Sequence, residues 1–167
     1  MPGSGVILRR LRVAIGRSLQ SQSAGVIVGP VDLVLDEMNG LVLHPPVAVL
    51  LPNRQSRLRA DSQIWGAPNL VVELLWPATA RRTRCSKLRW YANYGVEECW
   101  LIDTRRRRSE ILDFSGAAHL VRCIYSGSVP IQSRVVPRCV LRSVDLRDRD
   151  VDKRLRLPDS QGHVPWM

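Results

Sequence analysis

Apolar residues at helical spacing open the chain. Leu8, Leu11, Ile15 and Leu19 recur every three or four residues, with arginines between them. This spacing places the four side chains on one face of a helix. It predicts an amphipathic helix over residues 6–19 that packs against a core.

The next apolar residues alternate with the period of a β-strand. Residues 31–35 alternate between large apolar and polar or smaller side chains, and the dipeptide Asn39-Gly40 that follows is favoured in hairpin turns. Residues 41–52 are rich in valine and leucine and predict a second, more buried strand. Pro45-Pro46 lies in its middle, although proline removes a donor from a strand ladder.

The centre of the chain combines a buried strand with a helix. Residues 53–67 are polar and predict a surface connection or a short helix. Residues 67–79 form a nearly continuous apolar run, which predicts a strand. Thr79 is a good N-cap for a helix that runs through Tyr94 and stops at Gly95.

The last predicted elements are strands. Residues 98–103 predict a buried strand, and the four arginines of residues 105–108 predict a solvated turn. Residues 110–114 and 119–125 predict two further short strands, which complete a meander. After about Asp145 the chain alternates between arginine and aspartate, which is typical of a frayed tail.

This order of elements predicts an α/β or α+β fold. We expect a mixed central β-sheet flanked by helices, with a C-terminal β meander. The length of 167 residues suits one domain with a substantial core. We therefore expect a single domain over residues 1–148 and a charged, disordered tail over residues 149–167.

Composition narrows the class of protein. Hydrophobic residues make up 45% and charged residues 24%, which favours a globular protein over a disordered one. No apolar run is long enough to cross a bilayer, and the start of the chain does not resemble a secretory signal, so we expect a cytoplasmic protein without a membrane partner. The net charge is +10, and all but two of the 25 basic residues are arginine. Arginine matches phosphate geometry, although a GC-rich genome also produces arginine-rich proteins.

The four cysteines show no metal-binding spacing. Cys85, Cys99, Cys123 and Cys139 form no CxxC pair and lie apart from the histidines. A structural zinc site or a disulfide is therefore not expected. We interpret the cysteines as small buried apolar residues.

Two ionisable residues are the strongest candidates for chemistry. Glu73 is flanked by apolar residues, and strand alternation places it on one face with Val71 and Leu75. A carboxylate in such surroundings needs a metal, a proton or an ion-pair partner. Lys87 is one of only two lysines and lies in the predicted helix, where it either contacts a phosphate or belongs to a solvated helix face.

The segment from Gly29 to Asp103 resembles a known family. Its matching stretches are GPVDLVLDEMNG, HPPVAVLLP, WGAPNLVVELLWPATARR and KLRWYANYGVEECWLID. They resemble the Uma family of "putative restriction endonucleases", part of the PD-(D/E)XK nuclease superfamily, and the resemblance continues to about Leu146. It implies a restriction-endonuclease-like core of helix, three strands, helix and strand, in agreement with the predicted order.

The resemblance also implies a chemistry. Members of this family are expected to hydrolyse DNA phosphodiesters with Mg²⁺, which activates water and neutralises charge on the phosphate. Glu73 matches the metal-binding glutamate, and Lys87 matches a helix lysine that stabilises charge in catalysis. Leu75 occupies the usual E-x-K lysine position, as expected when that lysine has moved to the helix. Asp103 matches an aspartate that we interpret as structural.

Three positions depart from the family pattern. Pro46 stands where the first metal-binding aspartate is expected, Asn69 replaces the aspartate of the PDLVVE motif, and Trp76 replaces a small serine. With Glu73 as the remaining carboxylate, we expect weak Mg²⁺ binding, because Mg²⁺ takes oxygen ligands.

Asp32, on the neighbouring hairpin strand, is a candidate replacement for the lost aspartate. Pairing the hairpin strands about their turn puts Val31 opposite Pro46, so alternation turns Asp32 to the other face. We therefore do not expect Asp32 to replace the missing ligand.

Three functions fit these observations. The first is an impaired metal-dependent DNA endonuclease. The second is a catalytically inactive homologue that binds DNA or dimerises. The third is a degenerate gene product without a selected role. A homodimer is possible under the first two.

Overall fold

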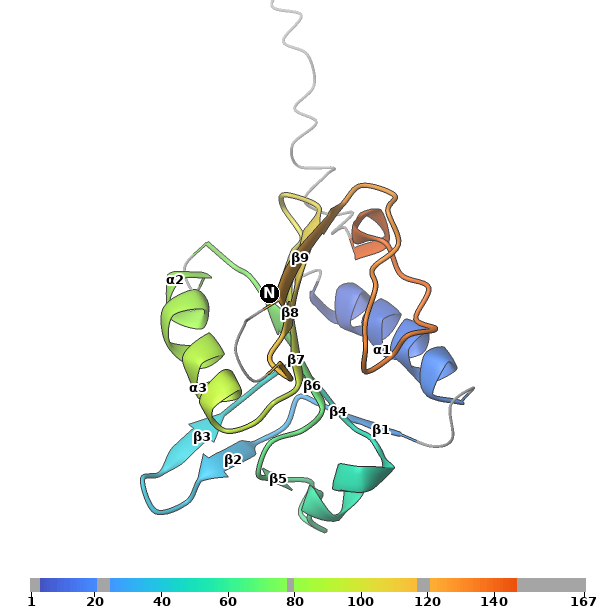
Figure 1. Cartoon of the computed structure of the whole chain (residues 1–167). Coiled ribbons are helices and arrows are strands. Elements are labelled where there is room, and N and C mark those ends of the chain that lie inside the picture. The colour runs from blue at the N-terminus through green and yellow to red at the C-terminus, as the bar shows by residue number, and fades with distance from the viewer. Residues whose placement is uncertain (1–3, 21–24, 78–79, 117–120, 147–167) are drawn as a thin grey trace, which may run out of the picture.

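The computed structural model describes residues 4–20, 25–77, 80–116 and 121–146. A mixed six-stranded sheet lies at its centre, in the order β1-β4-β6-β7-β8-β9 (Figure 1). Only the central pair β6 and β7 is parallel; the other neighbours are antiparallel. The strands are β1 (Val26–Val28), β4 (Val47–Leu50), β6 (Leu70–Leu74), β7 (Glu98–Asp103), β8 (Arg108–Asp113) and β9 (Val121–Ser126). This confirms the predicted mixed sheet and α+β class.

Helix α1 (Ser4–Gln20) covers one face of this sheet (Figure 1). Ile7, Leu11, Ile15 and Leu19 are buried against sheet residues that include Val72 and Trp100. The predicted amphipathic helix is therefore confirmed, with Ile7 added to its buried face and Leu8 only partly buried.

The C-terminal segment, residues 130–146, packs beside α1 on the same face (Figure 1). Sequence patterning assigned no element here, because the segment is irregular apart from the short helix η3 (Ser143–Leu146). Glu98 of β7 anchors it by accepting hydrogen bonds from Ser133 Oγ at 2.5 Å and Arg134 N at 2.9 Å. The buried residues of the segment include Ile131, Val135, Val136, Leu141 and Leu146.

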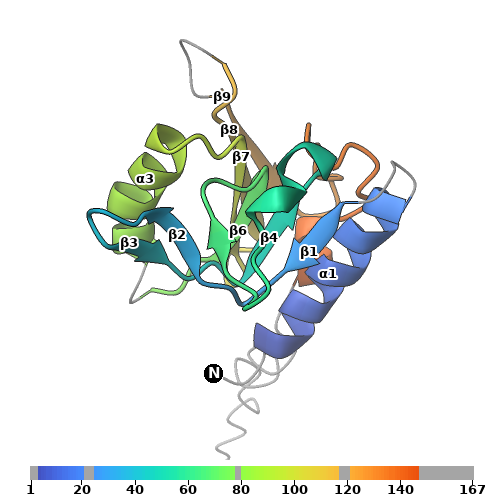
Figure 2. The same cartoon turned by 90° about the horizontal axis from the view of Figure 1, so that it is seen from below.

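The opposite face is covered by a continuous helical stretch (Figures 1 and 2). It comprises α2 (Ala80–Arg82), a π-helical turn (Thr83–Lys87) and α3 (Leu88–Asn93). Gly95 follows with φ 87°, a left-handed conformation suited to a residue without Cβ, so the predicted stop is confirmed. The proposed N-cap, Thr79, lies outside the described residues.

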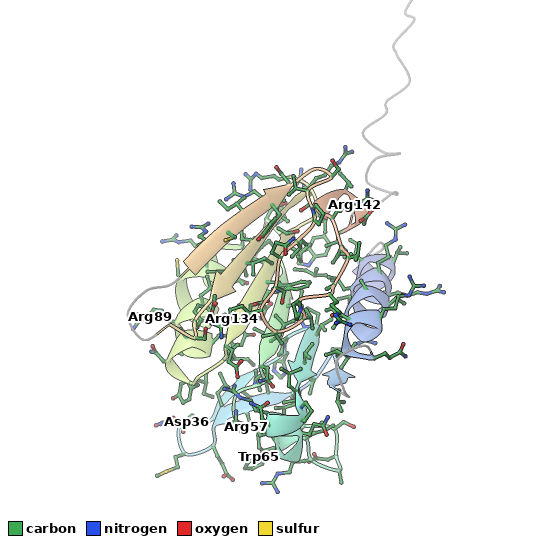
Figure 3. All side chains as sticks on the ribbon, turned by 45° about the vertical axis from the view of Figure 1, so that its right-hand side comes forward. Asp36, Arg57, Trp65, Arg89, Arg134 and Arg142 are labelled. Carbon is green, nitrogen blue, oxygen red and sulfur yellow. The ribbon has the colours of Figure 1, made fainter. Side chains whose placement is uncertain are left out.

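A small second sheet lies beside α3 and forms one end of the molecule (Figures 1 and 2). Its order is β3-β2-β5, with β2 (Leu33–Asp36), β3 (Leu41–Leu43) and β5 (Ile64–Trp65). Asp36 and Trp65 of this sheet lie at the end opposite Arg142 of the C-terminal segment (Figure 3). The hairpin is confirmed, but β5 was not foreseen within the polar stretch that also contains the 3₁₀ helix η1 (Pro52–Arg57).

The single strand predicted over residues 41–52 is wrong. The structure splits it into β3 and β4, which belong to different sheets. Pro45-Pro46 lies between them, and because proline carries no N–H it cannot continue a ladder. The proline pair therefore marks the point where the chain passes from the small sheet to the large one.

Smaller expectations have mixed outcomes. The turn before β8 covers residues 104–107, and Arg108 already belongs to the strand. Cys99 and Cys139 are buried as expected, whereas Cys85 and Cys123 are exposed, so the interpretation of all four as core residues is wrong. Residues 149–167, the predicted tail, lie outside the described residues. Among the helices described, none is long and apolar enough to span a membrane.

Candidate nuclease centre

Glu73 lies in the centre of the large sheet. It belongs to β6, whose five residues are all buried, and it is only 4% exposed. Its neighbours on the same face, Val71 and Leu75, join the core beneath α3, while Val72 and Leu74 pack on the α1 side. The alternation predicted from sequence is thus confirmed, and the carboxylate points toward the helix that carries Lys87.

Lys87 and Tyr91 both donate hydrogen bonds to the carboxylate of Glu73. The Nζ of Lys87 lies 2.7 Å from Oε1, and the hydroxyl of Tyr91 lies 2.5 Å from the same atom. Lys87 ends the π-helical turn and Tyr91 follows one helical turn later on α3, so both side chains reach the same strand residue. The structure thus brings together Glu73 and Lys87, the two candidate residues of the sequence analysis.

Tyr91 was not identified from the sequence. It is fully buried, and burial together with the adjacent Glu73 carboxylate raises the pKa of its hydroxyl, which therefore stays protonated as a donor. Its position four residues after Lys87 was the available signal, but an aromatic residue on a helix is more often simply part of the core.

A cavity of about 460 Å³ opens beside Glu73 and Lys87. Glu73, Lys87 and Pro46 all contribute to its wall. In the antiparallel pairing of β4 with β6, Val47 is opposite Val72, so the next step places Pro46 opposite Glu73. The described residues that line the cavity are Leu8, Val42, Leu43, His44, Pro46, Glu73, Leu74, Trp76, Thr83 and Lys87.

His44 also lines this cavity and was not singled out from the sequence. Its Nδ1 lies 2.8 Å from Oδ1 of Asp32, and both side chains are largely exposed. The predicted pairing of Val31 with Pro46 is wrong by one residue, because Val31 N bonds to Pro45 O. A bulge between Val34 and Asp36 shifts the hairpin register.

A second buried carboxylate, Glu110 on β8, lies in line with Glu73. Glu73 pairs with Leu101 of β7, and Leu101 pairs with Glu110, so both acidic residues lie on the α3 face, two strands apart. Arg84, in the same π-helical turn as Lys87, makes a two-pronged bond to Glu110 at 2.8 and 2.6 Å. Two ion pairs therefore connect one helical turn to the sheet.

Two further arginines contact Glu110. Arg108 Nη2 lies 3.0 Å from Oε1 of Glu110, and Arg122 Nη2 donates a hydrogen bond to Oε2. Burial alone would raise the pKa of Glu110, but the hydrogen bonds and positive charges of Arg84 and Arg122 outweigh it and lower the pKa to about 2. The same carboxylate raises the pKa of the Arg84 guanidinium.

Comparison with known proteins identifies the family of this chain. A family model described as "Uma2: Putative restriction endonuclease" matches residues 2–143. The chain belongs to the Uma2 family. The predicted resemblance is therefore confirmed over most of the sequence.

A solved structure shares the fold of this Uma2 chain. It is described as a "putative nuclease belonging to DUF820" from Anabaena variabilis, with a TM-score of 0.70 and 14% sequence identity. The match covers 87% of this chain and 80% of that one. No curated protein matches the sequence. Family and fold are thus those of restriction-endonuclease-like nucleases.

Two of the positions expected to depart from the family pattern, Asn69 and Trp76, have well-defined surroundings. Asn69 is buried, and its Nδ2 donates to Glu97 Oε1 at 2.9 Å while its Oδ1 accepts from Leu51 N at 2.8 Å. An ionised aspartate cannot donate to Glu97, so the amide suits this network. Trp76 is half-buried in the cavity wall, where its ring occupies space that a serine would leave open.

Asp103 has the surroundings of a structural residue. It is buried at the end of β7, and its Oδ1 accepts a hydrogen bond from Arg106 N at 2.9 Å. The Arg106 guanidinium lies 3.2 Å from the other carboxylate oxygen. These bonds close the turn between β7 and β8.

The donor set of this Uma2 chain does not fit a firmly bound Mg²⁺ ion. Mg²⁺ takes oxygen ligands in near-octahedral geometry. Among the described residues lining the cavity, Glu73 is the only carboxylate, and Lys87 and Tyr91 already bond to it. Within the described ranges, no group of three or more His, Cys, Asp or Glu side chains is arranged to hold a metal ion. Proline at position 46 supplies no side-chain oxygen.

Proposed function

We propose that this chain is a restriction-endonuclease-like protein that acts on DNA, with its cleavage centre at the Glu73–Lys87 cavity and its activity impaired by proline at position 46. The observation that carries the proposal is the position of Pro46, opposite Glu73 in the wall of the same cavity. That is where a second carboxylate would complete a nuclease centre.

Glu73 and Lys87 have opposite tasks in this proposal. Glu73 is the acidic residue left for a divalent cation such as Mg²⁺, and Lys87 stabilises negative charge on a DNA phosphate. At present each satisfies the other at 2.7 Å. Because Lys87 and Tyr91 already bond to Glu73, this carboxylate would hold a divalent cation only weakly, which supports an impaired activity.

Restoring the missing carboxylate tests this proposal. We expect Pro46→Asp to increase Mg²⁺-dependent nicking of supercoiled plasmid by more than about 100-fold, since even the loss of an outer-shell partner of a metal ligand costs 10–100-fold. Adding Glu73→Ala or Lys87→Ala to Pro46→Asp should remove the gain. Pro46→Asn is the shape-matched control and should give far less activity.

An inactive Pro46→Asp variant could mean either that the cleavage centre lies elsewhere or that the variant does not fold, and a second measurement distinguishes the two. Thermal unfolding shows whether Pro46→Asp keeps the fold. A folded Pro46→Asp variant that nicks no faster than the natural chain would contradict the proposed centre.

A second candidate function is DNA binding without cleavage. The hydrogen bonds from Lys87 and Tyr91 to one oxygen of Glu73 favour it, because they satisfy the carboxylate without a metal. This function predicts DNA retention that persists in EDTA, weakens with salt and tolerates Glu73→Ala. Metal-dependent nicking by the natural chain that Glu73→Ala abolishes would exclude it.

A further inference from the structure

Glu110 is surrounded by more positive charge than is required to balance its single negative charge. Its carboxylate accepts hydrogen bonds from the guanidiniums of Arg84, Arg108 and Arg122. We call these four residues the Glu110 cluster. One negative charge faces three positive ones, so the cluster carries two positive charges in excess.

Arg84 alone already balances the carboxylate. Its fork bonds both oxygens of Glu110, which is the strongest geometry for an arginine–carboxylate pair. Arg108 and Arg122 each add a single bond to an oxygen that is already bonded. Arg122 also helps to keep Glu110 ionised, but two cations beyond the Arg84 pair repel each other and Arg84, which favours a further anionic partner.

The guanidiniums are held in place and still reach solvent. The side chains of Arg84, Arg108 and Arg122 are 34%, 38% and 44% exposed. Each guanidinium has five N–H donors, of which the carboxylate takes one or two. The Nε of Arg108 is buried without a hydrogen-bond partner. The cluster therefore combines unused donors with an arrangement already fixed by Glu110, as an anion-binding site requires.

The cluster lies beside the proposed cleavage cavity. Glu110 and Glu73 share one face of the sheet with one strand between them, which corresponds to about 10 Å at the usual strand spacing. DNA rises 3.4 Å per base pair along one strand, so this separation spans about three base pairs. A duplex with one phosphate at the cavity can place another backbone phosphate at the cluster.

We infer that the Glu110 cluster is a phosphate-binding site that holds the DNA backbone next to the cleavage cavity, with Glu110 fixing the three guanidiniums in position. This inference rests on the proposed action on DNA and adds to it the side from which DNA approaches. The ligand is a backbone phosphodiester, recognised by arginine forks without reading the base sequence.

A hollow on the other side of the sheet offers a control. It has a volume of about 780 Å³, lies between α1 and the C-terminal segment, and is also lined by arginines, among them Arg9 and Arg17. Removing two charges there changes the net charge as much as removing Arg108 and Arg122. Comparing the two removals separates a local site from a general effect of charge.

The experiment measures binding of a short DNA duplex in EDTA at several salt concentrations, by fluorescence anisotropy. We expect the double variant Arg108→Ala/Arg122→Ala, which keeps the balanced Arg84–Glu110 pair, to weaken binding at least about tenfold and to reduce the salt slope by roughly two. Arg9→Ala/Arg17→Ala should change the affinity less than about twofold. Arg108→Lys/Arg122→Lys should keep the salt slope but lose affinity, because lysine has no fork.

The possible outcomes separate the inference about the Glu110 cluster from the proposed action on DNA. Equal losses in the two alanine variants, with binding by the natural chain intact, would overturn the inference and leave the proposed function standing. Absence of any DNA binding by the natural chain at low salt would overturn both. If thermal unfolding shows that the double variant does not fold, the single variant Arg122→Ala replaces it, because Arg122 lies on the edge strand β9. About half the change in salt slope is then expected.

Discussion

Glu73 and Glu110 are two buried carboxylates on one face of one sheet, and their surroundings differ in charge. Glu73 faces one lysine and one neutral tyrosine hydroxyl, so its site is close to neutral. Glu110 faces three arginines and its site is strongly positive. The first carboxylate lines a cavity, whereas the second holds a group of cations in place.

The difference indicates a division of tasks. A nearly neutral site with a single carboxylate and a lysine on a long, flexible side chain can rearrange around a ligand. A carboxylate held by three guanidiniums cannot bind a cation, because every one of its oxygens already faces positive charge. We therefore assign the proposed chemistry to Glu73 and the proposed phosphate binding to the arginines around Glu110.

Removal of Glu110 should have the largest effect on stability. Glu110→Ala leaves three guanidiniums facing one another. We expect the free energy of unfolding to fall by about 3 kcal/mol. This is at the low end for breaking a buried ion pair, because the arginines are partly exposed. Glu73→Ala leaves the buried Tyr91 hydroxyl without its acceptor, but Lys87, 20% exposed on a flexible stem, can turn toward the cavity, so the cost should be about 2 kcal/mol. Urea unfolding of both variants measures the difference. A larger loss for Glu73→Ala would reverse the comparison.

The pH dependence of stability should sharpen the contrast. The folded pKa of Glu110, about 2, lies below its ordinary value of 4.5. Its contribution is therefore present above pH 4.5 and is lost as the pH falls from there toward 2. We expect the natural chain to exceed Glu110→Gln in stability by up to about 3 kcal/mol at pH 6, and by much less at pH 2.5.

Urea unfolding of both proteins across this pH range measures the effect. A stability difference between them that stays constant from pH 6 to pH 2.5 would show that the ionised Glu110 does not stabilise the fold. The Glu110→Gln variant is the suitable reference because it keeps the shape of the side chain.

The smallest expected effect concerns Tyr91. Tyr91→Phe removes a buried donor to the charged Glu73 and should cost about 1.5 kcal/mol. Tyr94→Phe is the matched control, since its hydroxyl also bonds a carboxylate, Asp36 at 2.7 Å, but at the surface. We expect Tyr94→Phe to lower the free energy of unfolding much less, because solvent screens a contact at the surface. Equal costs for the two variants would mean that burial does not strengthen the Glu73 contact.

Sequence patterning predicted the elements that carry the site. Strand alternation placed Glu73 on the face opposite Val72, and the candidate N-cap Thr79 together with the stop at Gly95 located the helix of Lys87. These are local properties, because the side-chain direction follows from the repeat of one strand or one helix. The absence of a possible metal ligand at position 46 could also be predicted locally, since proline has no side-chain oxygen in any surroundings.

The partners of these residues were not predictable in the same way. The bulge in the hairpin moved Asp32 next to His44, and a single residue of shift reverses the faces of paired side chains. The Glu110 cluster joins the helical turn of Arg84 with two strands that follow much later in the sequence. No local pattern connects Arg84 with Arg122.

Residue types and their spacing were enough to predict which faces are apolar, where Glu73 and Lys87 lie on their elements, and that position 46 offers no side-chain oxygen. The placement of Pro46 opposite Glu73 and the meeting of three arginines at Glu110 became known from the folded chain. The physical reason is that periodicity fixes the direction of a side chain within its element. Its neighbours depend on strand order and register, which are set by packing between distant parts of the chain.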